Sequence, residues 1–166
     1  MKKSQKQSGF TLIELILYLA IVSIILVSIS YLMLDMLSGQ TKNYTSQDIN
    51  QQLRFISNII TKDIRAAQDI TSISDDNLVL TMPGDDITLH FDTANSTLTR
   101  QVGFSNLIIL HDTSVKVTGV FADQSYDART KNVAVTLRLE YDNPSNQPEY
   151  AASTTAIFSA ELRGRK

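Results

Sequence analysis

The sequence predicts an α+β fold in which a long N-terminal helix packs on an antiparallel β-sheet. Three observations predict it: an uncharged apolar run from Leu15 to Leu34, an amphipathic helical period between residues 45 and 69, and a change to two-residue alternation from residue 70 onward. The helix has a membrane-spanning half and an amphipathic half. The alternating segments supply the strands against which the amphipathic half packs.

The apolar run is long enough to cross a membrane. About twenty residues rising roughly 1.5 Å each match a hydrocarbon core of about 30 Å. Neither Gly nor Pro interrupts residues 10–38, and apolar side chains point in every direction, so no face is reserved for water. Lys2, Lys3 and Lys6 precede the run and Asp35 follows it, which predicts a cytoplasmic N-terminus and an exported remainder.

The residues around the start of the run form a recognisable motif. Lys6-Gln7-Ser8-Gly9, followed by Phe10-Thr11-Leu12-Ile13-Glu14 and the apolar helix, resembles the class III signal of type IV pilin-like proteins, which include pilins, minor pilins and pseudopilins. In that family a membrane peptidase cuts after the glycine on the cytoplasmic side and methylates the new amino terminus, and the apolar helix is retained. The resemblance implies cleavage between Gly9 and Phe10, with Phe10 becoming N-methylphenylalanine.

Glu14 would then be the fifth residue of the mature chain. Burying a lone carboxylate at the head of a membrane helix costs roughly 2.5 to 3.5 kcal/mol on insertion scales. Where such helices stack in a filament, the resemblance implies that the amino-terminal ammonium of a neighbouring subunit meets this carboxylate. An ion pair at low dielectric is strong when its geometry is good, so Glu14 is predicted to set the register of assembly.

Two other interpretations of the N-terminal segment stay open. Ser28-Ile29-Ser30 has the small-x-small pattern of an ordinary signal-peptide cleavage site, which would release a soluble secreted domain. An uncleaved helix would instead make the chain a membrane-anchored, exported β-rich binding or adhesion module. Neither interpretation assigns a function to Glu14.

The class III interpretation divides the chain into four parts: a cleaved leader at 1–9, a transmembrane helix at 10–37, the amphipathic half of the helix at 45–69 and an antiparallel β domain at 70–166. The polar residues 38–43 between the helical halves are where the helix is expected to bend or fray. Cleavage removes three lysines and leaves 12 basic against 17 acidic residues. No nucleic-acid partner is therefore expected.

The amphipathic half has one apolar stripe, formed by Ile49, Leu53, Ile56, Ile60, Ile64 and Ala67. Asp63 and Arg65 fall mostly off this stripe and are predicted to be solvated. The pattern Arg-x-x-x-x-x-Ile-x-x-Asp-Ile-Arg-x-Ala, from Arg54 to Ala67, is also similar to the corresponding helix of J-type minor pseudopilins of type II secretion and of related minor pilins.

The β domain is predicted to contain five to seven antiparallel strands in sequence order, separated by Gly-, Pro-, Asn- and Asp-rich turns. The clearest strand alternates apolar and polar residues, which predicts one face on a core and one in water. The segments that read as strands are 77–82, 87–91, 97–102, 107–110, 115–121, 133–141 and 156–162.

Residues with catalytic or metal-binding chemistry are few. His90 and His111 are the only histidines, and neither has a Cys or a second His at ligand spacing, so both are predicted to be surface residues. Three acidic clusters fall in predicted loops: Asp75-Asp76, Asp85-Asp86 and Asp123/Asp127. Their carboxylate oxygens are ligands of the kind that Ca²⁺ binds, but none of the clusters forms an EF-hand loop. Solvated turns also explain these aspartates. No cofactor and no enzymatic activity are expected.

The expected function is that of a minor pilin or pseudopilin. The resemblance implies a single-pass protein of the cytoplasmic membrane that, after processing by the prepilin peptidase and methyltransferase, leaves the lipid and joins other pilin or pseudopilin subunits in an extracytoplasmic filament. It also implies an inner-membrane assembly platform and an assembly ATPase as partners. Many major pilins have a helix-breaking proline where this chain has Tyr31, and a disulfide, whereas this chain has no cysteine. The tip-most pseudopilin of type II secretion typically lacks the glutamate.

Overall fold

The computed structural model describes residues 11–127 and 130–163. It contains one long helix, α1 (Leu12–Ala66), followed by strands and a short 3₁₀ helix, η1 (Pro148–Tyr150). The predicted α+β fold, a long N-terminal helix with antiparallel sheets packed on it, is therefore confirmed. The leader residues Lys2, Lys3, Lys6 and Gly9 and the first mature residue, Phe10, lie outside the described residues.

Contacts divide the chain into two units, Met1–Gln40 and Thr41–Lys166. In the first unit, every described residue is exposed. Residues 38–43, where the helix was expected to bend or fray, are helical throughout, so the predicted fraying was wrong. No proline lies in this stretch, and the local polarity alone does not end the helix.

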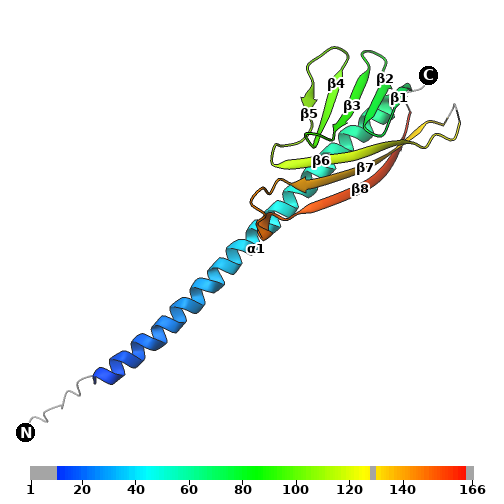
Figure 1. The fold of residues 1–166 in the computed structure, drawn as a ribbon. Helices are drawn as coiled ribbons and strands as arrows, with labels where there is room; N and C mark the ends of the chain where they lie inside the picture. Colours follow the sequence, from blue (N-terminus) through cyan, green and yellow to red (C-terminus); the bar gives the residue numbers. More distant parts are fainter. Residues whose placement is uncertain (1–10, 128–129, 164–166) are drawn as a thin grey trace, which may run out of the picture. The chain divides into compact units, whose positions relative to one another are not determined.

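The amphipathic part of α1 supplies one wall of the core of the second unit. Ile49, Ile56, Ile60 and Ile64 are almost completely buried, and Leu53 is partly buried beside them, as the apolar stripe predicted. Figure 1 shows the strands lying against this part of the helix. The helix ends at Ala66 and the chain enters the first strand three residues later.

The strands form two antiparallel sheets. The first has five strands in sequence order: β1 (Asp69–Ile73), β2 (Asn77–Thr81), β3 (Ile87–Asp92), β4 (Thr97–Val102) and β5 (Ile108–Ile109). The second has three: β6 (Val115–Asp123), β7 (Asn132–Tyr141) and β8 (Ser153–Glu161). The seven predicted strands are present, and the structure adds β1 and separates the strands into two sheets.

The two sheets contact each other through aromatic side chains of β3 and β6. The rings of Phe91 and Phe121 are almost fully buried, with centroids 4.7 Å apart. Backbone hydrogen bonds also join β6 to the turns of the first sheet: Val117 N–H donates to Ser96 O at 2.7 Å, and Phe121 N–H donates to Asp75 O at 2.9 Å. The core is thus one cluster shared by the helix and both sheets.

Gly119 in β6 makes this contact between the sheets sterically feasible. A Cβ at this position would lie 2.5 Å from Phe91 Cζ and 2.5 Å from the carbonyl oxygen of Thr136. The first atom belongs to a buried ring and the second to the backbone of the neighbouring strand, so neither can move away cheaply.

We predict that Gly119→Ala lowers the free energy of unfolding of the β domain by about 1 to 3 kcal/mol, the usual cost of overpacking a core. Chemical denaturation of the full chain in detergent, followed by near-UV circular dichroism, measures the change. Gly84→Ala is the matched control, because a Cβ at Gly84 would meet nothing within 4 Å. Equal stability of the two variants would contradict the steric role of Gly119.

Candidate functional site

Helix α1 begins next to the predicted cleavage position, with Thr11 as its N-cap. The Glu14 N–H donates to Thr11 Oγ1 at 3.4 Å, and the Leu15 N–H donates to the Thr11 carbonyl at 3.2 Å. Thr11 and Glu14 thus stand in the Thr-x-x-Glu spacing of a capping box. Sequence reasoning missed this local role, although the spacing was visible in the motif itself.

Glu14 lies in the first turn of α1 and is exposed in the isolated chain. It is the only charged residue between residues 11 and 34. The ion pairs that join described residues involve other side chains, so within the described part of the chain Glu14 has no cationic partner. A negative charge in the first turn is favourable to the helix, because the helix dipole is positive there.

The residues after Glu14 are suited to lipid. Among residues 11–127 and 130–163, α1 is the one helix long and apolar enough to cross a membrane. Three serine hydroxyls of the apolar run are satisfied within the helix: Ser23 donates to Leu19 O at 2.7 Å, and Ser28 and Ser30 donate to the carbonyls four residues earlier at 2.8 Å. No hydroxyl of these serines therefore needs water at membrane depth.

The prediction for Asp63 was wrong. It was expected to be solvated, but its residue is only 6% exposed. Arg100 of β4 binds it with two hydrogen bonds, Nε to Oδ2 at 2.7 Å and Nη2 to Oδ1 at 3.1 Å. The hydrogen bonding that Arg100 donates to the Asp63 carboxylate raises the pKa of Arg100. The bidentate pair fixes the amphipathic helix to the first sheet.

Arg65, two residues later, is exposed as predicted. His90 and His111 are both half-buried, and His90 lies on the less buried face of β3. His111 follows β5, the edge strand, where the chain returns toward α1. The sequence holds no local signal for this return.

The acidic loop clusters have roles in turns. Asp76 accepts a hydrogen bond from Ser74 Oγ at 2.8 Å, and Asp123 accepts one from Ser125 N–H at 2.9 Å. Hydrogen bonds from Ser125, the side-chain bond first, lower the pKa of Asp123. Among the described residues no three His, Cys, Asp or Glu side chains gather as a metal site. The structure therefore adds no support for the calcium alternative.

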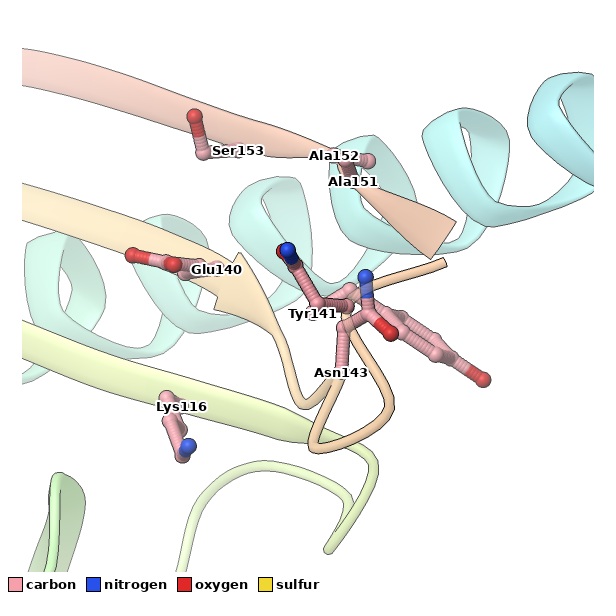
Figure 2. A pocket seen from close by; sticks show the side chains of 8 residues that line it. Lys116, Glu140, Tyr141, Asn143, Ala151, Ala152 and Ser153 are labelled. Atoms are coloured by element: carbon pink, nitrogen blue, oxygen red, sulfur yellow. The ribbon is translucent and has the colours of Figure 1, made fainter. Parts of the chain in front are cut away.

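A polar pocket of about 260 Å³ lies where β6, β7 and β8 meet the loop after β7. Figure 2 shows Lys116 and Glu140 on neighbouring strands, with Asn143 on the loop beside them. Lys116 Nζ forms an ion pair with Asp142 Oδ1 at 2.8 Å, and this hydrogen bond raises the pKa of Lys116. The charges in the pocket thus already have local partners, and the arrangement holds the loop in place.

Comparisons with known proteins identify the N-terminal segment. The family model described as the prokaryotic N-terminal methylation motif matches residues 4–30, a segment that contains Gly9, Phe10 and Glu14. No curated protein and no solved structure matches the chain. The motif family is structural rather than catalytic, and it implies processing by prepilin peptidase, assembly with other pilins and a single-pass membrane anchor. Residues 4–30 thus carry the N-terminal methylation motif, which supports the predicted class III signal of a type IV pilin-like prepilin.

Proposed function

We propose that this protein is a minor pilin or pseudopilin, a structural subunit of a type IV pilus-like or type II secretion pseudopilus filament. The observation that carries the proposal is the methylation motif over residues 4–30, together with the exposure of every residue from 11 to 40 of the apolar helical segment that overlaps it. A helix with no buried face in its own chain needs lipid or other helices around it. In a filament core, the equivalent helices of other subunits supply those neighbours after the chain has left the membrane.

Glu14 is the proposed assembly residue. Cleavage between Gly9 and Phe10 would create an ammonium on Phe10, four residues before Glu14 in the sequence. The exposed carboxylate, which has no cationic partner among the described residues, would accept the ammonium of an adjacent subunit. Such a pair forms in only one axial register, because a shift of either helix strands both charges in an apolar bundle.

A minor rather than a major subunit is favoured by two departures from the commonest pilin pattern. Tyr31 stands where many major pilins have a proline, and α1 passes through it as regular helix. The chain has no cysteine, so a disulfide does not hold the exported domain together. Retention of Glu14 argues against the tip-most subunit of a pseudopilus. The assignment to the J-type minor pseudopilins is the most specific part of the proposal, and it rests on the helix motif around Asp63.

The proposed orientation places Lys2, Lys3 and Lys6 in the cytoplasm and residues 70–166 outside. The leader 1–9, the span 10–37, the amphipathic half 45–69 and the β domain are the corresponding proposed parts. The peptidase and methyltransferase act at Gly9 and Phe10, and an inner-membrane platform with its ATPase drives assembly. Because the mature chain would have more acidic than basic residues, the proposal includes no nucleic-acid partner.

The proposal is tested by isolating filaments from the source cells by shearing and searching them for this chain by immunogold labelling and mass spectrometry. Gly9→Leu is the control, because it removes the residue after which the peptidase is expected to cut. We expect the unsubstituted chain in filaments and the variant only in the membrane. A chain found only as a soluble secreted domain, or only in membranes of cells whose filaments lack it, contradicts the proposal.

A further inference from the structure

Strand β8 forms one edge of the three-stranded sheet, in which the strand order is β6-β7-β8 (Figure 1). It has nine residues, and its pairing with β7 continues from Ser153 to Glu161 without a bulge. Its sequence contains no proline and no basic residue, and its one charged residue, Glu161, stands at the end. Natural proteins usually shorten, bend or charge a free edge, because such an edge can pair with another chain. Most of β8 lacks these protections.

The other three sheet edges are short, bulged or already bonded. β5 has two residues, and β1 has five with a bulge between Ile70 and Ser72. The free side of β6 is bonded to the first sheet, since the Val117 and Phe121 N–H groups donate to its turns. Within residues 11–127 and 130–163, β8 is therefore the one long edge that is left open.

The backbone groups on the free side of β8 are unpaired in the described part of the chain. The Tyr141 N–H donates to Ala152 O at 3.0 Å just before β8, and the Leu162 N–H donates to the chain before β7 at 3.1 Å. Bonded positions alternate in an antiparallel pair, so even-numbered residues of β8 face β7 and odd-numbered residues face away. No hydrogen bond between described residues uses the backbone groups of the odd-numbered set: Ser153, Thr155, Ile157, Ser159 and Glu161.

The apolar core is also open along β8. Val135 and Leu137 of β7 are completely buried. Phe158 and Ala156 lie directly opposite them on β8, on the same face of the sheet, but are only half-buried. An added strand with apolar residues on this face would cover both side chains. Unpaired backbone and open core therefore favour the same occupant, an extended polypeptide segment.

β8 runs in the same direction as the part of α1 beside it. The Arg163 N–H, just after β8, donates to Arg65 O at 3.0 Å near the end of α1. At the other end, Ser153 of β8 and Ser46 of α1 line one hollow of about 320 Å³. Two copies pair identical edges symmetrically when the strands are antiparallel. Such a pair would turn the two α1 helices in opposite directions, whereas subunits that share one membrane or filament have parallel helices.

We propose that β8 accepts an extended strand from a different subunit of the filament, which becomes the fourth strand of the sheet. Hydrogen bonds between the two backbones supply the attraction, and the side chains select the donor. The donor segment has no proline at its bonded positions and has apolar residues at every second position, where they cover Ala156 and Phe158. The choice of a filament subunit rests on the proposed function, whereas the open edge does not.

The open edge is tested by amide hydrogen exchange of the full chain in detergent micelles, observed by NMR. The Ile157 N–H faces away from β7, whereas the Ala156 and Phe158 N–H groups face it. We expect the Ile157 amide to exchange at least about tenfold faster than those of its two neighbours. Equal protection of the three amides would show that the edge is already paired and would overturn the proposal.

The donor strand is identified in cells with a photoreactive phenylalanine analogue at position 157. We expect cross-links to an extended segment of another filament subunit. The matched control is the same analogue at position 120, which lies in the same cross-strand row on β6, at the opposite edge of the sheet. It should not reach that segment. Cross-links only to a second copy of this chain or to proteins outside the filament, or none in filaments that contain the chain, would overturn the proposal while leaving the proposed function intact.

The backbone contribution is tested by Ile157→Pro, with Ile157→Val as the matched control. Proline removes an N–H that faces away from β7, and edge strands tolerate proline on that side. Chemical denaturation in detergent checks that both variants fold. We expect Ile157→Pro to enter filaments at least about tenfold less well than Ile157→Val. Equal incorporation of the two folded variants would overturn the proposal.

Failure of the proposed function gives a different result. A chain that never enters filaments, but whose position 157 still cross-links to an extended segment of another protein, would reject the proposed function and support the added strand. Absence from filaments together with no cross-link at position 157 would reject both.

Discussion

Glu14→Ala is expected to be cleaved and inserted into the membrane normally but to enter filaments at least about tenfold less well than the unsubstituted chain. The reason is that the variant leaves the ammonium of an adjacent Phe10 buried without its counter-charge. The ratio of filament-borne to membrane-borne chain, measured by quantitative immunoblotting of sheared and membrane fractions, gives the effect. Processing is checked in the same samples by the mass of the mature chain.

Two conservative variants separate this role from the local role of Glu14 in starting the helix. Glu14→Asp retains the charge, and we expect it to retain most of the incorporation. Glu14→Gln keeps the backbone N–H that donates to Thr11 Oγ1 and keeps a side-chain oxygen that can accept a hydrogen bond, but it removes the charge, and we expect it to fail like the alanine variant. Normal incorporation of Glu14→Gln would show that capping, rather than an intersubunit ion pair, is what the residue supplies.

Arg100→Leu should lower the free energy of unfolding of the β domain by about 2 kcal/mol. Breaking a fully buried pair typically costs about 3 to 5 kcal/mol, but the Arg100 side chain is 23% exposed, and water compensates part of the loss at Asp63. Denaturant unfolding of the full chain in detergent, followed by near-UV circular dichroism, measures the difference.

A double variant and a surface pair serve as controls. Asp63→Leu combined with Arg100→Leu removes both charges and should recover part of the stability, because no uncompensated carboxylate is left buried. Lys116→Leu breaks the exposed pair with Asp142 and should shift the unfolding midpoint little. A double variant less stable than Arg100→Leu alone would contradict the explanation.

Local periodicity predicted most of the fold. The apolar stripe of α1 was found because helical spacing brings Ile49, Ile56 and Ile60 to one face, and β7 because its residues alternate. β1 was not predicted as a strand, since its sequence, Asp-Ile-Thr-Ser-Ile, is short and mostly polar, and a bulge between Ile70 and Ser72 interrupts its pairing. The division into two sheets depends on contacts between distant strands, which periodicity does not encode.

In the candidate site, too, residues that are close in the sequence were predicted and contacts between distant residues were not. Glu14 and the cleavage motif lie within a few consecutive residues, so the sequence alone indicates them. The partner of Asp63 lies 37 residues away on β4, and an Asp on a helix with a distant Arg on a strand gives no local signal of burial. The hydrogen bond from the Asp112 N–H to Gln52 Oε1 likewise joins residues that are 60 apart in the sequence. Such pairs become visible only when the tertiary fold is known.

The central claim is that the apolar helix remains on the mature chain after cleavage at Gly9. The intact mass of the chain, recovered from membranes and from filaments, tests it most directly. We predict a chain that begins at N-methylated Phe10 in both fractions. A mature chain that begins at Tyr31, or one that keeps Met1 in every fraction, would contradict the account.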